Sequence, residues 1–171
     1  MQPAESAFER GINAASELTG RAAAWLTLLM VIATCIVVVL RYLFDTGVIW
    51  LQESVTWMHA AVFMLGAAYT LKRDEHVRVD VFYRELPARR QALVDLLGVL
   101  LFVFPLCGFL GIASVDYVAA SWEAGEVSRN AGGLPYPFVP LLKSTLLLMP
   151  LAVLLQGIAM ALGALARLRS R

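Results

Sequence analysis

The sequence predicts an all-α integral membrane protein with four transmembrane helices, both termini cytoplasmic, and an N-terminal amphipathic helix at the membrane interface. Of the 171 residues, 60% are hydrophobic and only 16% are charged, whereas soluble domains average roughly 45–50% and ~25%. Four apolar stretches are each long enough to cross a hydrocarbon layer ~30 Å thick. Lys and Arg are concentrated in alternate connections between these stretches.

This composition also excludes whole classes of protein. A soluble globular enzyme does not fit so high an apolar content. The formal net charge is +1, so no basic excess points to a nucleic-acid partner. We therefore expect one membrane domain over residues 1–171, with the lipid bilayer as its surroundings.

Residues 1–21 form the predicted interfacial segment. Apolar residues recur there at helical spacing, and polar or charged residues occupy other positions. Glu5 and Glu9 do not fit the basic start of a cleaved signal peptide, so we expect the segment to be retained. The apolar set is Phe8, Ile12, Ala15 and Leu18.

The four predicted spans differ in how clearly the sequence defines them. Ala22–Leu40 has 19 residues without a charge, about 28 Å of helix. The third stretch exceeds what a bilayer needs and contains Pro105, so we expect a kink or tilt, and Pro150 lies inside the fourth. The predicted spans are 22–44, 48–71, 92–122 and 139–165, joined by a cytoplasmic loop at 72–91 and a periplasmic loop at 123–138.

The distribution of basic residues predicts the orientation, because cytoplasmic flanks collect Lys and Arg. With the N-terminus inside, eleven of the 14 basic residues are cytoplasmic and only Arg41, Arg129 and Lys143 are not. Both termini are therefore predicted to be cytoplasmic. The periplasmic loop contains AGGLPYP at Ala131–Pro137, a turn-forming sequence that either faces a receptor or only links two spans.

No catalytic or metal-binding motif is evident. Cys35 and Cys107 lie in apolar spans without a CxxC pair, which favours a packing role. His59 lies within the second span, where an ionisable residue suggests function. It could hydrogen-bond within the bundle, for example to Thr56, bind a quinone, or ligate haem, although the other histidine, His76, is in the cytoplasmic loop.

Two further features are polar. Arg41 and Glu53 flank the short link between the first two spans at similar depth, so we expect them to pair; the alternative is contact with another subunit. Trp50 beside them fits an interfacial aromatic belt. The run Glu75–Tyr83 alternates polar and apolar residues, which predicts an extended strip lying on a membrane or partner, or a solvated basic anchor.

Two stretches carry a family resemblance. They are RYLFDTGVIWLQESV at Arg41–Val55 and FMLGAAYTLKRDEHVRVD at Phe63–Asp80. With four spans in a chain of this length, they resemble the small membrane subunit, DctQ type, of tripartite ATP-independent periplasmic (TRAP) transporters. The motif positions are structural or partner-interface candidates: Arg41, Tyr42, Trp50, Glu53, Gly66, His76, Arg78 and Asp80.

The resemblance implies a non-enzymatic transport subunit in the bacterial inner membrane. Its expected partners are a large permease subunit of DctM type and a periplasmic solute receptor of DctP type. The small subunit is expected to support the scaffold and receptor docking during uptake of an organic acid. Sodium coupling is expected in the large subunit, with no cofactor in this chain. Two alternatives stay open, a haem- or quinone-binding anchor of a redox complex and a stand-alone small exporter.

Overall fold

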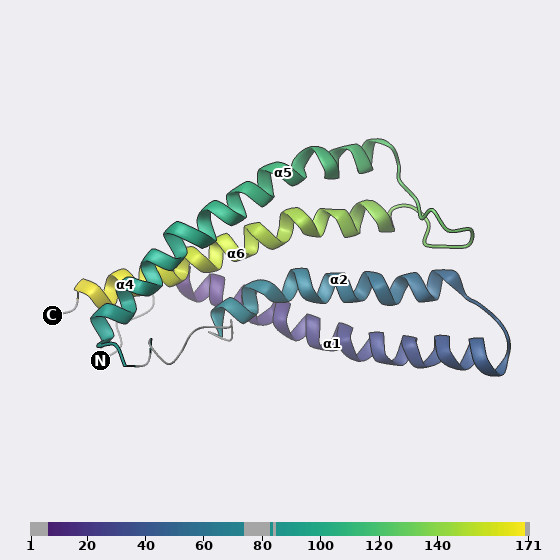
Figure 1. Cartoon of the computed structure of the whole chain (residues 1–171), viewed down its shortest axis with the longest axis horizontal. Helices are drawn as coiled ribbons and strands as arrows, with labels where there is room; N and C mark the ends of the chain where they lie inside the picture. The colour runs from purple at the N-terminus through teal and green to yellow at the C-terminus, as the bar shows by residue number, and fades with distance from the viewer. Residues whose placement is uncertain (1–6, 74–82, 84, 170–171) are drawn as a thin grey trace.

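The computed structural model describes residues 7–73, 83 and 85–169, and they form two helical hairpins (Figure 1). All regular structure in these residues is helical, and four stretches are long and apolar enough to cross a membrane. The prediction of four membrane-spanning helices is therefore confirmed. The elements are α1 (Ala7–Leu43), α2 (Ile49–Lys72), α4 (Ala88–Gly98), a π-helical turn (Val99–Val103), α5 (Phe104–Glu123) and α6 (Phe138–Arg169).

Both ends of the chain lie at the same end of the bundle (Figure 1). We call this the terminal end. The opposite end carries the α1–α2 link, residues 44–48, and the α5–α6 loop, residues 124–137, and we call it the loop end. Four crossings place the two termini on one side of a bilayer.

The N-terminal segment is helical, but it is continuous with the first span. α1 has 37 residues, about 55 Å at 1.5 Å per residue, which exceeds the ~30 Å hydrocarbon layer. No proline interrupts α1, and its first half is tied to the bundle by a 2.7 Å hydrogen bond from Ser16 to Gln156 of α6. Among the described residues, the predicted N-terminal amphipathic segment is therefore the first part of α1 and not a separate helix.

The α1–α2 link is short, as the sequence predicts. Asp45 adopts a left-handed conformation with φ of 49°, which Asp tolerates better than most residues. The Leu40 carbonyl near the helix end accepts both the Phe44 N–H at 3.3 Å and the Thr46 N–H at 3.0 Å. The short turn between the two helices makes α1 and α2 antiparallel neighbours.

The third helical stretch is irregular where Pro105 disturbs it. Pro105 has no N–H for the carbonyl of Leu101, and its ring crowds that carbonyl. The helix forms a π-helical turn at Val99–Val103. The Phe104 N–H at the end of this turn donates a hydrogen bond to the Val99 carbonyl. A π turn widens the helix by one residue, and α4 continues through it into α5.

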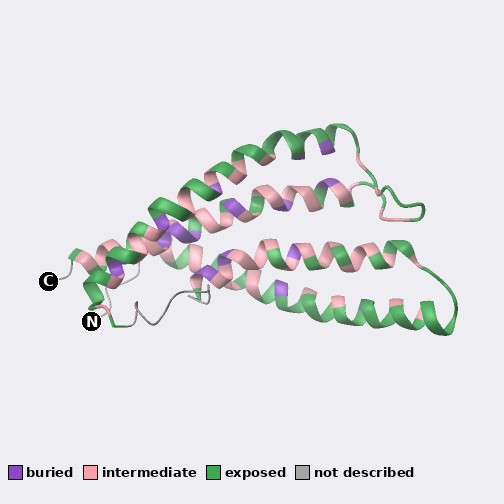
Figure 2. Ribbon diagram, in the orientation of Figure 1, coloured by how far each residue is buried: buried purple, intermediate pink, exposed green. Residues whose placement is uncertain are grey.

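α6 is the central helix, since it contacts α1, α2, α4 and α5. Close approach depends on small residues: a Cβ at Gly157 would lie 3.3 Å from Val103 of the π turn. Buried residues gather between the helices, whereas the outer faces are exposed (Figure 2). Interfaces made of small residues are typical of packed membrane helices. Those buried here include Ala61, Ala68, Ala92, Ala159 and Ala164.

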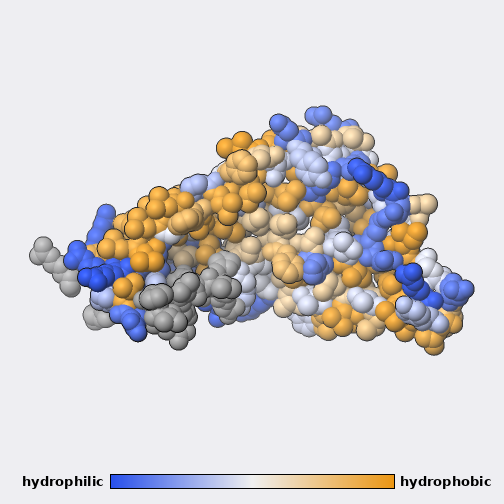
Figure 3. Space-filling view, in the orientation of Figure 1, coloured by the Kyte–Doolittle hydropathy of each residue, from blue (hydrophilic) through white to orange (hydrophobic). Residues whose placement is uncertain are grey.

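The exposed faces are apolar along the middle of the molecule. Apolar side chains cover the central part of the visible surface, and hydrophilic ones gather toward the two ends (Figure 3). Residues such as Trp25, Phe102 and Ile112 are 68%, 73% and 79% exposed. Surfaces of this kind are covered by lipid or by a partner protein.

Candidate functional site

At the loop end, one carboxylate holds the α5–α6 loop against α2. Glu53, half-buried near the start of α2, accepts hydrogen bonds at Oε1 from the Ser128 hydroxyl (2.5 Å) and the Asn130 side-chain amide (2.7 Å). Its Oε2 accepts the backbone N–H of Leu134 at 2.7 Å. We call these four residues the Glu53 latch. Since all three donors come from one loop, the latch fixes where that loop lies.

The loop folds tightly around this carboxylate. The Ser128 N–H donates to the Leu134 carbonyl at 3.2 Å, and the Gly133 N–H donates to the Asn130 carbonyl at 3.0 Å. A Cβ at Gly133 would lie 2.3 Å from the Ser128 hydroxyl oxygen and 2.6 Å from Glu53 Oε2. A larger residue at position 133 would therefore displace Ser128 or Glu53, while Gly132 adopts a positive φ of 77°.

An ion pair between Glu126 and Lys143 connects the same loop to α6. Glu126 accepts hydrogen bonds from the Lys143 ammonium and, at 2.6 Å, from the Ser121 hydroxyl. The Lys143 ammonium also lies 4.1 Å from the centroid of the Tyr117 ring, a cation–π contact. The hydrogen bond from Lys143, followed by that from Ser121, lowers the pKa of Glu126 below its usual value.

Aromatic side chains complete the loop end. Trp57 Nε1 donates to the Phe138 carbonyl at 3.0 Å, and Trp122 Nε1 donates to the Ser144 hydroxyl at 3.0 Å. Edge-on ring contacts join Trp57 to Phe138 and Trp122 to Tyr136. Tryptophans with a polar contact at one end of a span are typical of the membrane interface.

A cleft of about 580 Å³ lies between α2, the loop and the start of α6. Glu53, Trp57 and Asn130 line it together with apolar side chains of α6. Within the described ranges, no group of three or more His, Cys, Asp or Glu side chains could hold a metal ion. The Glu53 carboxylate already accepts hydrogen bonds from three protein donors. The arrangement therefore positions the α5–α6 loop and forms one wall of the cleft.

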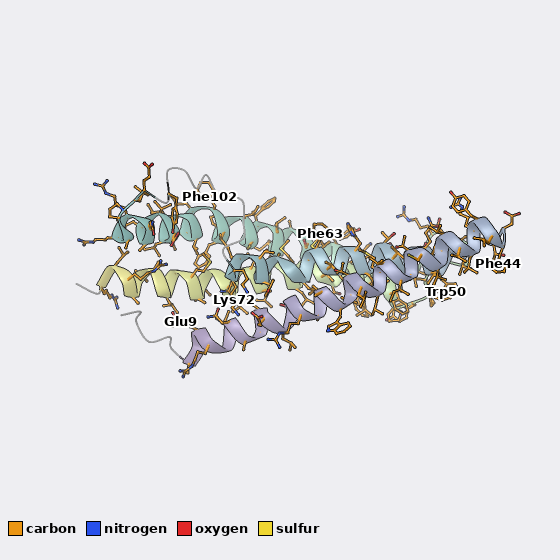
Figure 4. All side chains as sticks on the ribbon, turned by 90° about the horizontal axis from the view of Figure 1, so that it is seen from below. Glu9, Phe44, Trp50, Phe63, Lys72 and Phe102 are labelled. Atoms are coloured by element: carbon orange, nitrogen blue, oxygen red, sulfur yellow. The ribbon has the colours of Figure 1, made fainter. Side chains whose placement is uncertain are left out.

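The terminal end has its own charged cluster, between α1 and α2. Glu17 of α1 accepts from Lys72 and Arg73 of α2, each at 2.9 Å, and Arg21 lies 3.8 Å away. In Figure 4, Lys72 at the end of α2 lies beside α1. The hydrogen bond and charge of Glu17 raise the pKa of Arg73. This cluster joins the first hairpin at the end opposite to its link.

A family model of the DctQ component of tripartite ATP-independent periplasmic transporters matches residues 30–170. The chain belongs to the DctQ family. It is also 36% identical over 70 residues to the C4-dicarboxylate TRAP transporter small permease protein DctQ of Vibrio cholerae serotype O1. That alignment covers 41% of this chain and 30% of the relative. No solved structure matches the chain.

Membership of the DctQ family confirms the resemblance seen in the sequence. The matched region contains every motif position from Arg41 to Asp80 and the whole α5–α6 loop. The DctQ family is a family of transporter components and is not an enzyme family. With four candidate spans, the chain is an integral membrane member of that family.

The predicted ion pair between Arg41 and Glu53 is wrong. Arg41 is exposed in the last turn of α1, whereas Glu53 is turned to the α5–α6 loop and the start of α6. Similar depth in the membrane is not sufficient for an ion pair, because the two side chains must also face each other. Glu53 instead faces the loop. The carboxylate is satisfied by uncharged donors instead.

The other motif positions do not converge on one site. Tyr42 and Trp50 are 80% and 53% exposed beside the α1–α2 link; Trp50 and Phe44 mark this end in Figure 4. Gly66 lines a groove between α1 and α2. His76, Arg78, Asp80 and the predicted extended strip, apart from Tyr83, lie outside the described residues.

His59 is exposed on α2, and its ring lies 4.8 Å from that of Phe63. Among the described residues no hydrogen bond joins His59 to Thr56, and the Thr56 hydroxyl donates to the Gln52 carbonyl at 3.5 Å. Of the two cysteines, Cys107 is buried and Cys35 is exposed. The burial of Cys107 agrees with the packing role expected for it.

Several functional contacts were missed in the sequence. The latch donors Ser128 and Asn130 lie four and two residues before the GG pair, and that polar, turn-forming run was the available signal. At the terminal end, Glu17 could have been paired with the adjacent cations Lys72 and Arg73. Asp95 likewise accepts from Tyr83 at 2.8 Å and from Arg167 at 3.1 Å, which no local pattern indicates.

Proposed function

We propose that this chain is the small membrane subunit of a TRAP transporter in the bacterial inner membrane, with both termini cytoplasmic. It supports the scaffold of a large permease subunit of DctM type and helps to dock a periplasmic receptor of DctP type. The transported solute is an organic acid, and sodium coupling resides in the large subunit. The observation that carries this proposal is the DctQ match over residues 30–170.

The apolar surface supports the scaffold role. α1 and the α4–α5 stretch present exposed large apolar side chains along their length, and α1 packs with one side only on α2 and α6. A partner helix bundle that covers part of this surface would extend the membrane domain sideways. The basic residues at the terminal end, among them Arg21, Arg73 and Arg167, favour placing that end in the cytoplasm.

The loop end supports the docking role. In the proposed orientation the α5–α6 loop and the exposed Arg41, Tyr42 and Trp50 face the periplasm. The Glu53 latch and the Glu126–Lys143 pair hold that loop in one position, which lowers the conformational entropy that a partner would have to remove on binding. The solute class is taken from the name of the Vibrio cholerae relative, which is a C4-dicarboxylate transporter protein.

The proposal is tested by receptor-dependent uptake into membrane vesicles. Vesicles that contain the large subunit without this chain should lose sodium-driven uptake of the solute, and co-production of the wild-type chain should restore it. The exposed Glu123→Gln variant serves as a control that restores uptake fully. Uptake at the wild-type rate in the absence of the chain would rule out the proposal.

A further inference from the structure

A groove runs between α1 and α2 in the half of the bundle nearest the terminal end. Its volume is about 510 Å³. It is lined mainly by small or apolar side chains, and Phe63 and Tyr69 stand along α2 (Phe63 is labelled in Figure 4). Lining residues used below are Gly20, Ala24, Phe63, Gly66, Ala67 and Tyr69. The groove is mainly apolar, which suits a hydrocarbon chain.

Basic side chains stand at the terminal end of this groove. The Arg73 guanidinium lies 5.4 Å from the centroid of the Tyr69 ring, which itself lines the groove. Arg21 directly follows Gly20 of the groove wall. The side chains of Arg21 and Arg73 are 76% and 47% exposed, so both guanidinium groups are accessible from outside the bundle.

The charges of this cluster do not balance. Among the described residues, Arg21, Lys72 and Arg73 share the single carboxylate of Glu17. These four described side chains carry three cations and one anion, a formal charge of +2 beside the groove, while Asp74 and Glu75, which follow Arg73 in the sequence, lie outside the described residues. An anionic ligand would complement this charge, and guanidinium groups match phosphate oxygens in geometry and charge.

We propose that this groove binds an anionic phospholipid, with one acyl chain between α1 and α2 and the headgroup phosphate on Arg21 and Arg73. An apolar chain joined to an anionic head is the chemistry that an apolar groove with a cationic mouth complements. The cluster lies at the end of α2, where the hydrocarbon layer gives way to headgroups, so both parts of the lipid are at their usual depth. The inference does not depend on the proposed transport function.

The charge half of the proposal is tested by native mass spectrometry of the full-length chain in detergent. Phosphatidylglycerol and phosphatidylcholine with identical acyl chains are titrated separately. We expect phosphatidylglycerol to bind more tightly, and Arg21→Gln to weaken its binding about fivefold, because one basic residue near a membrane surface contributes about that factor. Phosphatidylcholine binding should not change.

A matched variant controls for the loss of one charge. Arg169→Gln removes an exposed arginine from the last turn of α6, away from the groove, and should bind phosphatidylglycerol like the wild type. Equal affinity of the wild type for the two lipids would overturn the proposal. So would an Arg169→Gln variant that weakens binding as much as Arg21→Gln.

The groove half is tested by filling the groove. A Cβ at Gly66 would meet nothing within 4 Å, and the same holds at Gly163 of α6. Both glycines are half-buried and lie six residues before the end of their helices. Gly66→Leu should therefore abolish tight binding of phosphatidylglycerol, whereas Gly163→Leu should bind like the wild type.

The competing occupant of the groove is a helix of another subunit. In that case the chain would show no phosphatidylglycerol preference, and Gly66→Leu would lower the yield of a copurifying subunit, which would overturn the lipid proposal. Equal lipid binding by Gly66→Leu and Gly163→Leu would also overturn it. Should Gly66→Leu fail to fold, the comparison of Arg21→Gln with Arg169→Gln still decides the question.

Discussion

Three donors of the α5–α6 loop converge on the carboxylate of Glu53, and this residue therefore controls the loop end. One donor is the backbone N–H of Leu134, which can only donate. A side chain with fewer acceptor sites at position 53 must leave a donor without a partner, and such losses are costly where water is scarce. The importance of Glu53 could be predicted from the sequence, but its partners could not, because they are 75 to 81 residues away along the chain.

Glu53→Gln is expected to loosen the loop. Glutamine keeps one oxygen and replaces the other by an amide that donates, so either Leu134 or the Ser128 and Asn130 pair loses its acceptor. Hydrogen exchange of the full-length chain in detergent should become severalfold faster across residues 128–134. Glu123→Gln, an exposed change of the same charge at the end of α5, should leave exchange there unchanged. Equal exchange in both variants would contradict the latch.

Glu126 gives the loop end a defined response to acid. Its pKa lies below the usual value of 4.5 because Lys143 and then Ser121 donate to the carboxylate. The folded state therefore binds the proton less readily than the unfolded state, so the contact stabilises above about pH 4.5 and the stabilisation is lost as pH falls through the lowered pKa. The melting-temperature difference between the wild type and Glu126→Gln should be constant near neutral pH and shrink below pH 4.5. A difference that persists unchanged into strong acid would contradict the assignment.

At the scale of elements, the first hairpin depends on the close approach of α1 and α2. A Cβ at Gly20 would lie 2.4 Å from two ring carbons of Tyr69, so the ring occupies the space that any larger residue would need. The helices themselves follow from apolar stretches and are readily predicted. Which glycine faces a ring depends on the rotation of both helices, and the sequence pattern alone does not specify it.

Gly20→Ala should destabilise the hairpin. Alanine favours helix over glycine by about 1 kcal/mol, but forcing the Tyr69 ring to move costs about 1–3 kcal/mol. We expect a lower melting temperature in detergent. Gly11→Ala, in the same helix with nothing within 4 Å of its Cβ, should melt at the wild-type temperature or above. If both variants are stabilised equally, the close approach of Gly20 is not limiting.

The irregular third stretch shows a second limit of sequence reasoning. Pro105 predicts a disturbance one turn before it, and the disturbance occurs at Val99–Val103. Its form, a π turn packed beside Gly157 of α6, depends on the neighbouring helix. The sequence therefore predicts that the helix changes there, and the tertiary packing decides how.

At the scale of the whole molecule, the exposed apolar surface is the dominant feature. Four crossings were predictable because composition and span length are physical requirements of a bilayer. The ion pairs could not be predicted, as the Arg41–Glu53 prediction shows, because an ion pair depends on which helix faces meet. Large residues on one side of α1 remain exposed in the isolated chain, including Leu28, Leu29, Val31, Ile32 and Ile36.

The central claim is that this chain works as a subunit beside a larger membrane protein, and copurification tests it most directly. The chain is tagged at its C-terminus, extracted from its native membrane in mild detergent, and its partners are identified by mass spectrometry. We expect one large polytopic permease in roughly equal amount. Recovery of the chain alone, stable and monodisperse, would contradict the claim.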